Sequence, residues 1–191
     1  TGWEPLDWRG YNEAMLVYVL GLGSPTHPLD STAWAAWATT YRWGTFYGRS
    51  HFGFPPLFGH QYSHVWIDFR GIQDDRVRAH GLDYFENSRR ATLSQRAYAI
   101  ANPGGWTGYG QDVWGLTASD GPADVTLSFG GQPRRFFTYA ARGASFTEPP
   151  RDDGTLAPTA VGGAVAFAPE IAIPALVAMR EAEAYSGPSM I

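Results

Sequence analysis

The sequence contains no cysteine and no lysine, because all fourteen basic residues among its 191 positions are arginines. Without cysteine the chain forms no disulfide, and it has no thiolate nucleophile and no Cys-ligated metal site. Without lysine it forms neither a Schiff base nor the phosphate-binding loop whose Lys contacts nucleotide phosphates. These two absences exclude several classes of covalent and nucleotide-dependent enzyme.

Basic runs and long hydrophobic runs are also missing. The net charge is −4 and the pI is about 5.7, which argues against a nucleic-acid partner. The longest apolar stretch, residues 14–23, is about half of what a bilayer crossing needs, so we expect no membrane span. The chain opens with Thr1, and no charged segment followed by an apolar stretch marks a signal peptide there.

Aromatic residues are abundant, with 8 Trp, 10 Tyr and 11 Phe. The length is that of one ordinary domain, which is enough to bury a sizeable core. Many Trp and Tyr side chains in one small acidic domain have two interpretations. They are either platforms beneath sugar rings or simply large residues of the core, and the composition does not separate the two.

The spacing of apolar residues predicts a mostly helical fold. We expect helices over residues 7–22, 31–47, 57–70 and 82–101, a short helix near 112–116, and a last helix from Pro169 or Pro174 to about residue 184. Alternating apolar residues around a Gly-Gly pair predict a β-hairpin over residues 125–139. The predicted fold class is therefore all-α, built from helical hairpins with one small β-hairpin insertion.

Glu13 is the first candidate for chemistry, because it lies in the opening turns of the most apolar predicted helix. Burial raises the pKa of a carboxyl group, whereas a helix N-terminus lowers it. A carboxyl that keeps its proton near neutral pH suits a general acid. The alternative is a structural Glu13 that pairs with one of the arginines.

His60, His64 and Asp68 follow one another at intervals of four residues, along one face of a predicted helix. Such a set can line a sugar site, form a hydrogen-bonded core network, or bind a metal. The zinc-protease motif requires Glu after its first His, and Gln61 stands there instead. We expect no metal and no other cofactor.

Two further carboxylates have both a binding and a structural interpretation. Asp120 lies in a turn-forming sequence and can either bind sugar hydroxyls or stabilise the turn. Glu170 follows Pro169 and can simply complement a helix start. What remains is carboxylate and hydroxyl chemistry among aromatic residues, and glycoside hydrolysis is the commonest reaction that needs it.

Six longer segments are specific enough to be compared with a known family. They are Tyr11–Asn–Glu–Ala–Met15, Leu22–Gly–Ser–Pro–Thr–His–Pro28, Phe58–Gly–His–Gln–Tyr–Ser–His–Val–Trp–Ile–Asp–Phe–Arg70, Asp83–Tyr–Phe–Glu–Asn–Ser–Arg–Arg90, Trp114–Gly–Leu–Thr–Ala–Ser–Asp–Gly–Pro122 and Phe167–Ala–Pro–Glu–Ile–Ala–Ile–Pro174. Together they resemble the bacterial glucoamylase-like domain family. That family includes endo-β-1,2-glucanases and is related to a domain of cyclic β-1,2-glucan synthases.

The resemblance implies an (α/α)6 toroid that binds sugar at the ends of its inner helices and hydrolyses a β-glucan, β-1,2-linked, with inversion. It implies that Glu13 is the general acid or its close partner. The residues that it places along the substrate cleft are Tyr11, Asn12, His60, Gln61, His64, Trp66, Trp114, Asp120 and Glu170. The implied partner is an oligo- or polysaccharide, and the implied location is the periplasm or outside the cell.

The length of the chain qualifies this interpretation. A toroid of this kind needs about twice as many residues, so we expect residues 1–191 to form one incomplete hydrolase domain without its N-terminal and last C-terminal helices. Inverting hydrolysis needs two carboxyl groups roughly 6.5–9.5 Å apart, and the partner of Glu13 is not identified. Two alternatives stay open: a carbohydrate-binding half-domain without turnover, and an α-glucan exo-hydrolase.

Overall fold

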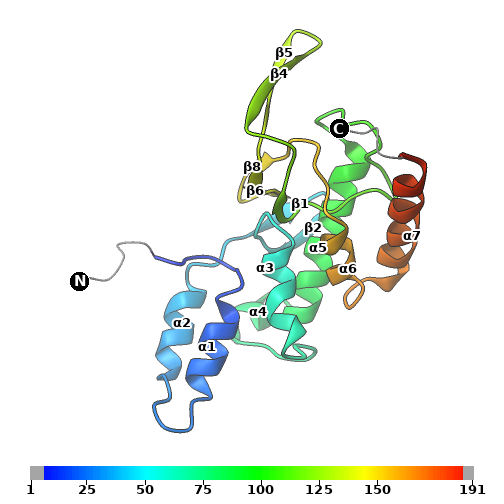
Figure 1. Cartoon of the computed structure of the whole chain (residues 1–191). Coiled ribbons are helices and arrows are strands. Elements are labelled where there is room, and N and C mark those ends of the chain that lie inside the picture. The colour runs from blue at the N-terminus through cyan, green and yellow to red at the C-terminus, as the bar shows by residue number, and fades with distance from the viewer. Residues whose placement is uncertain (1–6, 187–191) are drawn as a thin grey trace.

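A computed structural model describes residues 7–186, and the side chains of residues 7–181 (Figure 1). The helical elements in chain order are α1 (Met15–Leu22), α2 (Ser31–Ala38), α3 (Phe58–Gln61), the 3-10 helix η1 (Tyr62–Val65), α4 (Asp75–Ala79), α5 (Tyr84–Ala101), α6 (Pro158–Ala164) and α7 (Pro169–Ser186). The strands are β1 (Trp43–Phe46), β2 (Arg49–Phe52), β3 (Ala118–Asp120), β4 (Val125–Phe129), β5 (Gln132–Phe136), β6 (Tyr139–Ala141), β7 (Gly143–Ser145) and β8 (Glu148–Arg151).

Helix α5 passes through the middle of the structure and packs against α3, β2 and β7 (Figure 1). The Asp83 carboxylate caps its first turn by accepting a hydrogen bond from the Glu86 N–H at 2.7 Å. Asn102 ends the helix in the left-handed conformation, with φ at 44°. These boundaries confirm the helix predicted over residues 82–101.

The hydrophobic core of the described residues has three clusters, of which two are large, and each includes a residue of α5. The N-terminal cluster is aromatic and includes Tyr11, Trp37, Tyr41 and Tyr84. The C-terminal cluster is built mainly from small residues of α6 and α7 around Trp114 and Leu57. Much of the aromatic surplus of the sequence is therefore core, where large side chains bury the most apolar area.

The expectation of an all-α chain of helical hairpins is wrong. Within residues 7–186, eight short strands form four separate two-stranded antiparallel sheets, β1–β2, β3–β6, β4–β5 and β7–β8. Only the β4–β5 hairpin was expected, and it extends away from the rest of the structure (Figure 1). Its turn residues Gly130 and Gly131 both have positive φ, at 57° and 78°, as a two-residue hairpin turn requires.

The helix predicted over residues 31–47 is too long because a second hairpin follows α2. Strands β1 and β2 are joined by Tyr47 and Gly48, whose φ values of 46° and 77° close another tight turn. Trp43, Thr45 and Phe46 favour a pleated strand as readily as a helix, so their apolar spacing was misleading.

Other predicted helices are shorter than expected. The segment 7–14 forms turns, so the first helix begins only at Met15, and the segment 57–70 is helical only as far as Val65. Residues 112–116 form no helix, whereas α4 and α6 were not expected. The last helix does begin at Pro169. No helix in the described part of the chain is long and apolar enough to span a membrane.

Candidate functional site

The histidines of the segment 58–65 do not share one helix face. The segment changes from α-helix to the tighter 3-10 helix at Tyr62, which alters the direction of the side chains that follow. His60 is fully buried, and neither ring nitrogen has a hydrogen-bond partner among the described residues. His64 lies at the edge of the core instead, with its ring against Phe69 and Phe167.

Tyr11 connects these two histidines. Its ring stacks on His60, with 4.8 Å between the ring centroids and 26° between the planes. Its hydroxyl lies 3.2 Å from the Ser88 hydroxyl, which in turn lies 3.2 Å from Nε2 of His64. Ser88 comes from α5 and was not predicted, because nothing in its local sequence distinguishes it from a surface serine.

Burial keeps the ring nitrogens of this cluster from taking up a proton. It lowers the pKa of His64 to about 4, and it lowers the pKa of His60 well below the usual value, with a further contribution from nearby His51. Burial also raises the pKa of the Tyr11 hydroxyl to about 12. At neutral pH the cluster is therefore a set of uncharged rings with fixed hydrogen-bonding atoms.

Glu13 follows this cluster in the turn before α1. Its backbone carbonyl accepts a hydrogen bond from the Ser63 hydroxyl of η1 at 3.4 Å. Its carboxyl oxygen Oε2 is buried and has no hydrogen-bond partner in the described part of the chain. Burial raises the pKa of this carboxyl group. No described arginine pairs with Glu13, so the structural alternative of an ion pair finds no support here.

A hollow of about 290 Å³ adjoins His64 along η1 and the loop that follows it. Trp66 lies at its rim and is 66% exposed. Arg70 forms an ion pair with Asp68 at 3.0 Å and lies over the Phe85 ring at 4.5 Å. An exposed indole beside paired polar groups offers a flat apolar face together with hydrogen-bond donors and acceptors, which is what a sugar ring requires.

A smaller hollow of about 200 Å³ is lined by Tyr11, Phe54, Arg42 and Glu148. Glu148 is an exposed carboxylate on β8. Arg42 and Glu148 were not predicted as site residues, because they come from segments that only the fold brings next to Tyr11.

Three of the residues predicted to line the cleft are buried and serve the packing of the fold. The Asn12 side chain closes the turn before α1 by donating to the carbonyls of Arg9 and Gly10. The Gln61 amide donates to the Ala160 carbonyl at 2.7 Å and so joins α3 to α6. Trp114 is fully buried in the C-terminal cluster and has no exposed face for a sugar.

Two other predicted residues lie apart from this cluster. Asp120 is exposed at the end of β3, opposite Tyr139 of β6. Glu170 lies in the first turn of α7 and forms an ion pair with Arg89 of α5 at 2.6 Å. The described contacts of these two carboxylates do not include Glu13, Tyr11 or either histidine of the segment 58–65.

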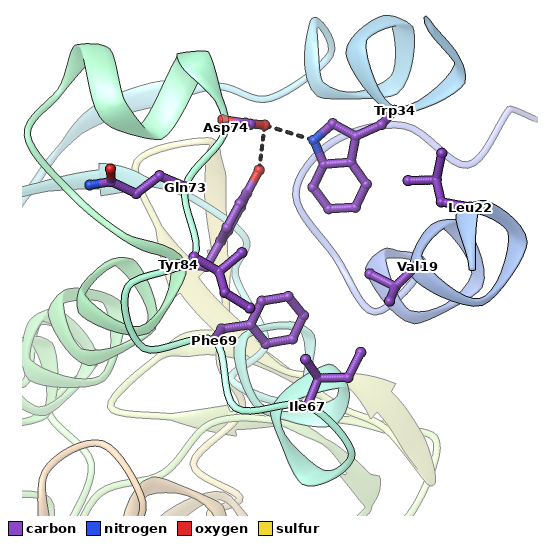
Figure 2. Close-up of a pocket in the computed structure, with 9 residues that line it drawn as sticks. Val19, Leu22, Trp34, Ile67, Phe69, Gln73, Asp74 and Tyr84 are labelled. Carbon is purple, nitrogen blue, oxygen red and sulfur yellow. Dashed lines mark hydrogen bonds between the residues drawn. The ribbon is translucent and has the colours of Figure 1, made fainter. Parts of the chain in front are cut away.

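A third pocket, of about 300 Å³, lies between α1, α2 and the loop before α4 (Figure 2). Its walls are mostly apolar, and none of the predicted cleft residues lines it. Its one charged group, the Asp74 carboxylate, accepts hydrogen bonds from Trp34 Nε1 at 2.8 Å and from the Tyr84 hydroxyl at 2.6 Å. Because that carboxylate also caps α4, its hydrogen bonds are already used by the fold.

Within the described residues, no three His, Asp or Glu side chains come close enough to hold a metal ion. His60 and His64 face different surroundings, and the carboxylate of Asp68 is occupied by Arg70. The chemistry that the site offers is therefore that of a carboxyl group and uncharged rings.

Comparisons with known proteins show the family to which this chain belongs. The Glycoamylase family model, described as "Putative glucoamylase", matches residues 5–188. An exo beta-1,2-glucooligosaccharide sophorohydrolase of Parabacteroides distasonis is 30% identical over 194 residues, which cover 87% of this chain and 24% of that protein.

Solved structures extend the match. An endo-beta-1,2-glucanase from Chitinophaga pinensis, solved with sophorotriose and glucose, has a TM-score of 0.72 and 28% identity over 98% of this chain and 43% of its own. A protein of Bacteroides fragilis, described as a "putative glucoamylase", has a TM-score of 0.75 and 29% identity over 94% of this chain and 42% of its own. This chain thus spans less than half the length of these relatives, and it belongs to the Glycoamylase family.

Proposed function

We propose that this chain is part of a glycoside hydrolase that cleaves β-1,2-linked glucan with inversion, and that Glu13 is its general acid. The observation that carries the proposal is the buried, unpartnered oxygen of Glu13, together with the raised pKa of that carboxyl group. A raised pKa increases the share of the protonated carboxyl, which can donate its proton to the departing glycosidic oxygen. The names of the sophorohydrolase and of the endo-β-1,2-glucanase support the choice of linkage.

The substrate lies against η1 in this proposal. A glucose ring packs on the exposed face of Trp66, and its hydroxyls exchange hydrogen bonds with Asp68 and Arg70. Tyr11 and His64 present fixed, uncharged polar atoms from behind. Asn12, Gln61 and Trp114 support the fold around the site through hydrogen bonds and packing and do not contact the sugar. We assign no sugar contact to Asp120 or Glu170.

Inversion also needs a second carboxylate that activates a water molecule on the opposite side of the sugar. Glu148 is a candidate for this second group, because it lines a hollow together with Tyr11. Tyr11 precedes Glu13 by two positions in the sequence. We propose further that residues 1–191 belong to one hydrolase domain, since the family model matches along nearly the whole chain.

Glu13→Gln in the full chain tests the assignment. Gln keeps the size of the side chain but cannot donate the proton, so we expect kcat on β-1,2-glucan to fall by at least about 100-fold. Far-ultraviolet circular dichroism should be unchanged. Glu86→Gln is the matched control, because Glu86 forms an ion pair with Arg90 on α5 and is outside the site. Undiminished turnover by Glu13→Gln would remove Glu13 from the mechanism.

A carbohydrate-binding half-domain without turnover is the second candidate, because the chain spans only 43% of the endo-β-1,2-glucanase. In that case β-1,2-glucan quenches the tryptophan fluorescence of the chain while no reducing ends appear. Release of glucose from maltooligosaccharides would instead favour an α-glucan exo-hydrolase over both.

A further inference from the structure

A hollow of about 430 Å³ lies between the C-terminal end of α5 and the projecting β4–β5 hairpin. It is lined by Tyr98, Trp106, Gln132, Arg134 and Asp152, among others. Its walls come from three separate parts of the sequence: the end of α5 with the turn that follows, strand β5, and the end of β8. None of the residues assigned above to the hydrolytic site lines it.

The indole of Trp106 forms one wall of the hollow. The Asn102 side chain accepts a hydrogen bond from the backbone N–H of Trp106 and donates one to its carbonyl, both at 2.8 Å. The backbone of Gly154, with φ at 86°, lies so close that a Cβ there would meet the indole ring at 2.6 Å. Asn102 thus fixes the backbone of Trp106, and the absence of a side chain at Gly154 lets the indole pack closely there.

Arg134 of β5 lies over this fixed ring, with its guanidinium carbon 4.3 Å from the centroid of Trp106. Stacking orients the guanidinium plane, and the N–H donors then point sideways. Within the described part of the chain, the Arg134 guanidinium has neither an ion pair nor a hydrogen bond, although its backbone belongs to the β4–β5 ladder. The hollow thus contains a set of oriented donors without an acceptor.

The opposite charge in the hollow is equally well fixed. Asp152 accepts hydrogen bonds from the hydroxyls of Tyr98 at 2.9 Å and Tyr109 at 2.7 Å. Arg135 also lines the hollow, and its charge is paired with Asp124 at 3.6 Å. Among the described lining residues, Arg134 is therefore the cation without an ion pair, and Asp152 is an anion that would oppose a phosphate or another polyanion. A neutral ligand rich in hydroxyl groups suits this balance of charge.

This hollow is distant from the hydrolytic site along α5. Ser88, which bridges Tyr11 and His64, and Tyr98, which lines the hollow, are ten residues apart on that helix. A helix rises about 1.5 Å per residue, which separates the two positions by roughly 15 Å. One short sugar cannot occupy both places.

We propose that the hollow between α5 and the β4–β5 hairpin is a second carbohydrate-binding site, which holds an outer part of a long glucan chain through Arg134 and Gln132. This inference rests on the proposed function for its choice of sugar. The hollow takes part in no catalytic step, and it changes only the affinity of the chain for long substrates.

The test compares Arg134→Ala with the wild-type full chain, using linear β-1,2-glucan and sophorotriose as probes. Titration calorimetry gives Kd, and initial rates give KM and kcat. We expect Arg134→Ala to raise Kd and KM for the long glucan by about tenfold, since the oriented donors are lost, and to leave kcat and the values for sophorotriose unchanged. Gln132→Ala, on the exposed hairpin, should weaken binding of the long glucan in the same direction. Arg78→Ala on α4 is the control and should change neither.

An unchanged Kd for the long glucan in Arg134→Ala would overturn the proposal, even if the wild-type protein cleaves that glucan normally. Binding of inorganic phosphate that disappears in Arg134→Ala would also overturn it, since an anion would then be the ligand. A wild-type chain that neither binds nor cleaves any β-1,2-glucan would refute the proposed function, and this inference with it.

Discussion

At the scale of single residues, the described side chains of the site are mostly groups that burial holds uncharged. His51 and His64 each have a pKa lowered to about 4, and burial is the largest cause for both. Glu13 shows the opposite direction for the same reason, because desolvation favours the neutral form of an acid and of a base alike. Acid therefore lowers the free energy of unfolding through the buried histidines of the site and not through the Glu13 carboxyl group.

His64→Gln tests this sensitivity. Below about pH 6.5 the unfolded chain protonates His64, whereas the folded chain does so only near pH 4, so acid favours unfolding. We expect His64 to lower the unfolding free energy by up to about 2 kcal/mol between pH 7 and pH 5. His64→Gln should remove that part of the pH dependence in urea titrations.

Thr126→Ala on the exposed face of β4 provides the control for this measurement, because it removes no titratable group. This variant should leave the difference between pH 7 and pH 5 as it is in the wild type. The same difference in His64→Gln and in the wild type would contradict the buried, neutral state of His64.

At the scale of elements, a side chain of α3 forms a hydrogen bond to the backbone of α6. The Gln61 amide donates to the Ala160 carbonyl and lies directly against Gly163. A Cβ at Gly163 would come within 2.6 Å of the Gln61 side-chain oxygen, whereas a Cβ at the adjacent, exposed Gly162 would meet nothing within 4 Å. Of these two neighbouring glycines of α6, Gly162 has space for a larger side chain and Gly163 does not.

Gly163→Ala should destabilise the protein by about 1–3 kcal/mol, because Gln61 must move and its hydrogen bond is strained. Gly162→Ala should instead stabilise it by about 0.5–1 kcal/mol, since alanine reduces the freedom of the unfolded chain at a helical position. Thermal unfolding of the two variants measures both effects. Shifts of the same sign in the two variants would contradict the packing of Gln61 against α6.

The elements also show where prediction from sequence succeeds. Helix α5 was predicted because its Asp83 cap and its end before Pro103 are local signals. The β1–β2 hairpin was missed because its turn depends on the positive φ of Tyr47, a conformation uncommon for a tyrosine. In the site, His60 and His64 could be picked out from their spacing in the sequence. The Ser88 hydroxyl that links Tyr11 to His64 could not be predicted, because residues distant in sequence meet only after folding.

At the scale of the whole molecule, one buried ion pair joins the small sheets. Arg142 contacts Asp153 through two hydrogen bonds of 2.6 and 2.7 Å, and both side chains are almost completely buried. Its guanidinium also donates to the carbonyls of Ser119 on β3 and of Phe137 beside β6. No sheet in the described part of the chain has more than two strands, so this pair supplies a connection that a larger sheet would provide by itself.

A double-mutant cycle measures that connection. Arg142→Met and Asp153→Leu should each destabilise the chain by about 3–5 kcal/mol, because each leaves the other charge buried and unpaired. The double variant should lose clearly less than the sum of the two, by more than about 0.5 kcal/mol in urea unfolding. Additive losses would show that the two side chains act independently.

The tip of the β4–β5 hairpin has a practical consequence. Gly130 and Gly131 are exposed and turn with positive φ, and a Cβ at either position would meet no other described atom within 4 Å. Extra residues inserted between them would project into solvent and disturb no packed contact. Because the native sequence has no cysteine, a single one introduced there would be the sole attachment point for a fluorescent dye. Such a label would report the approach of polysaccharide to the hairpin in real time.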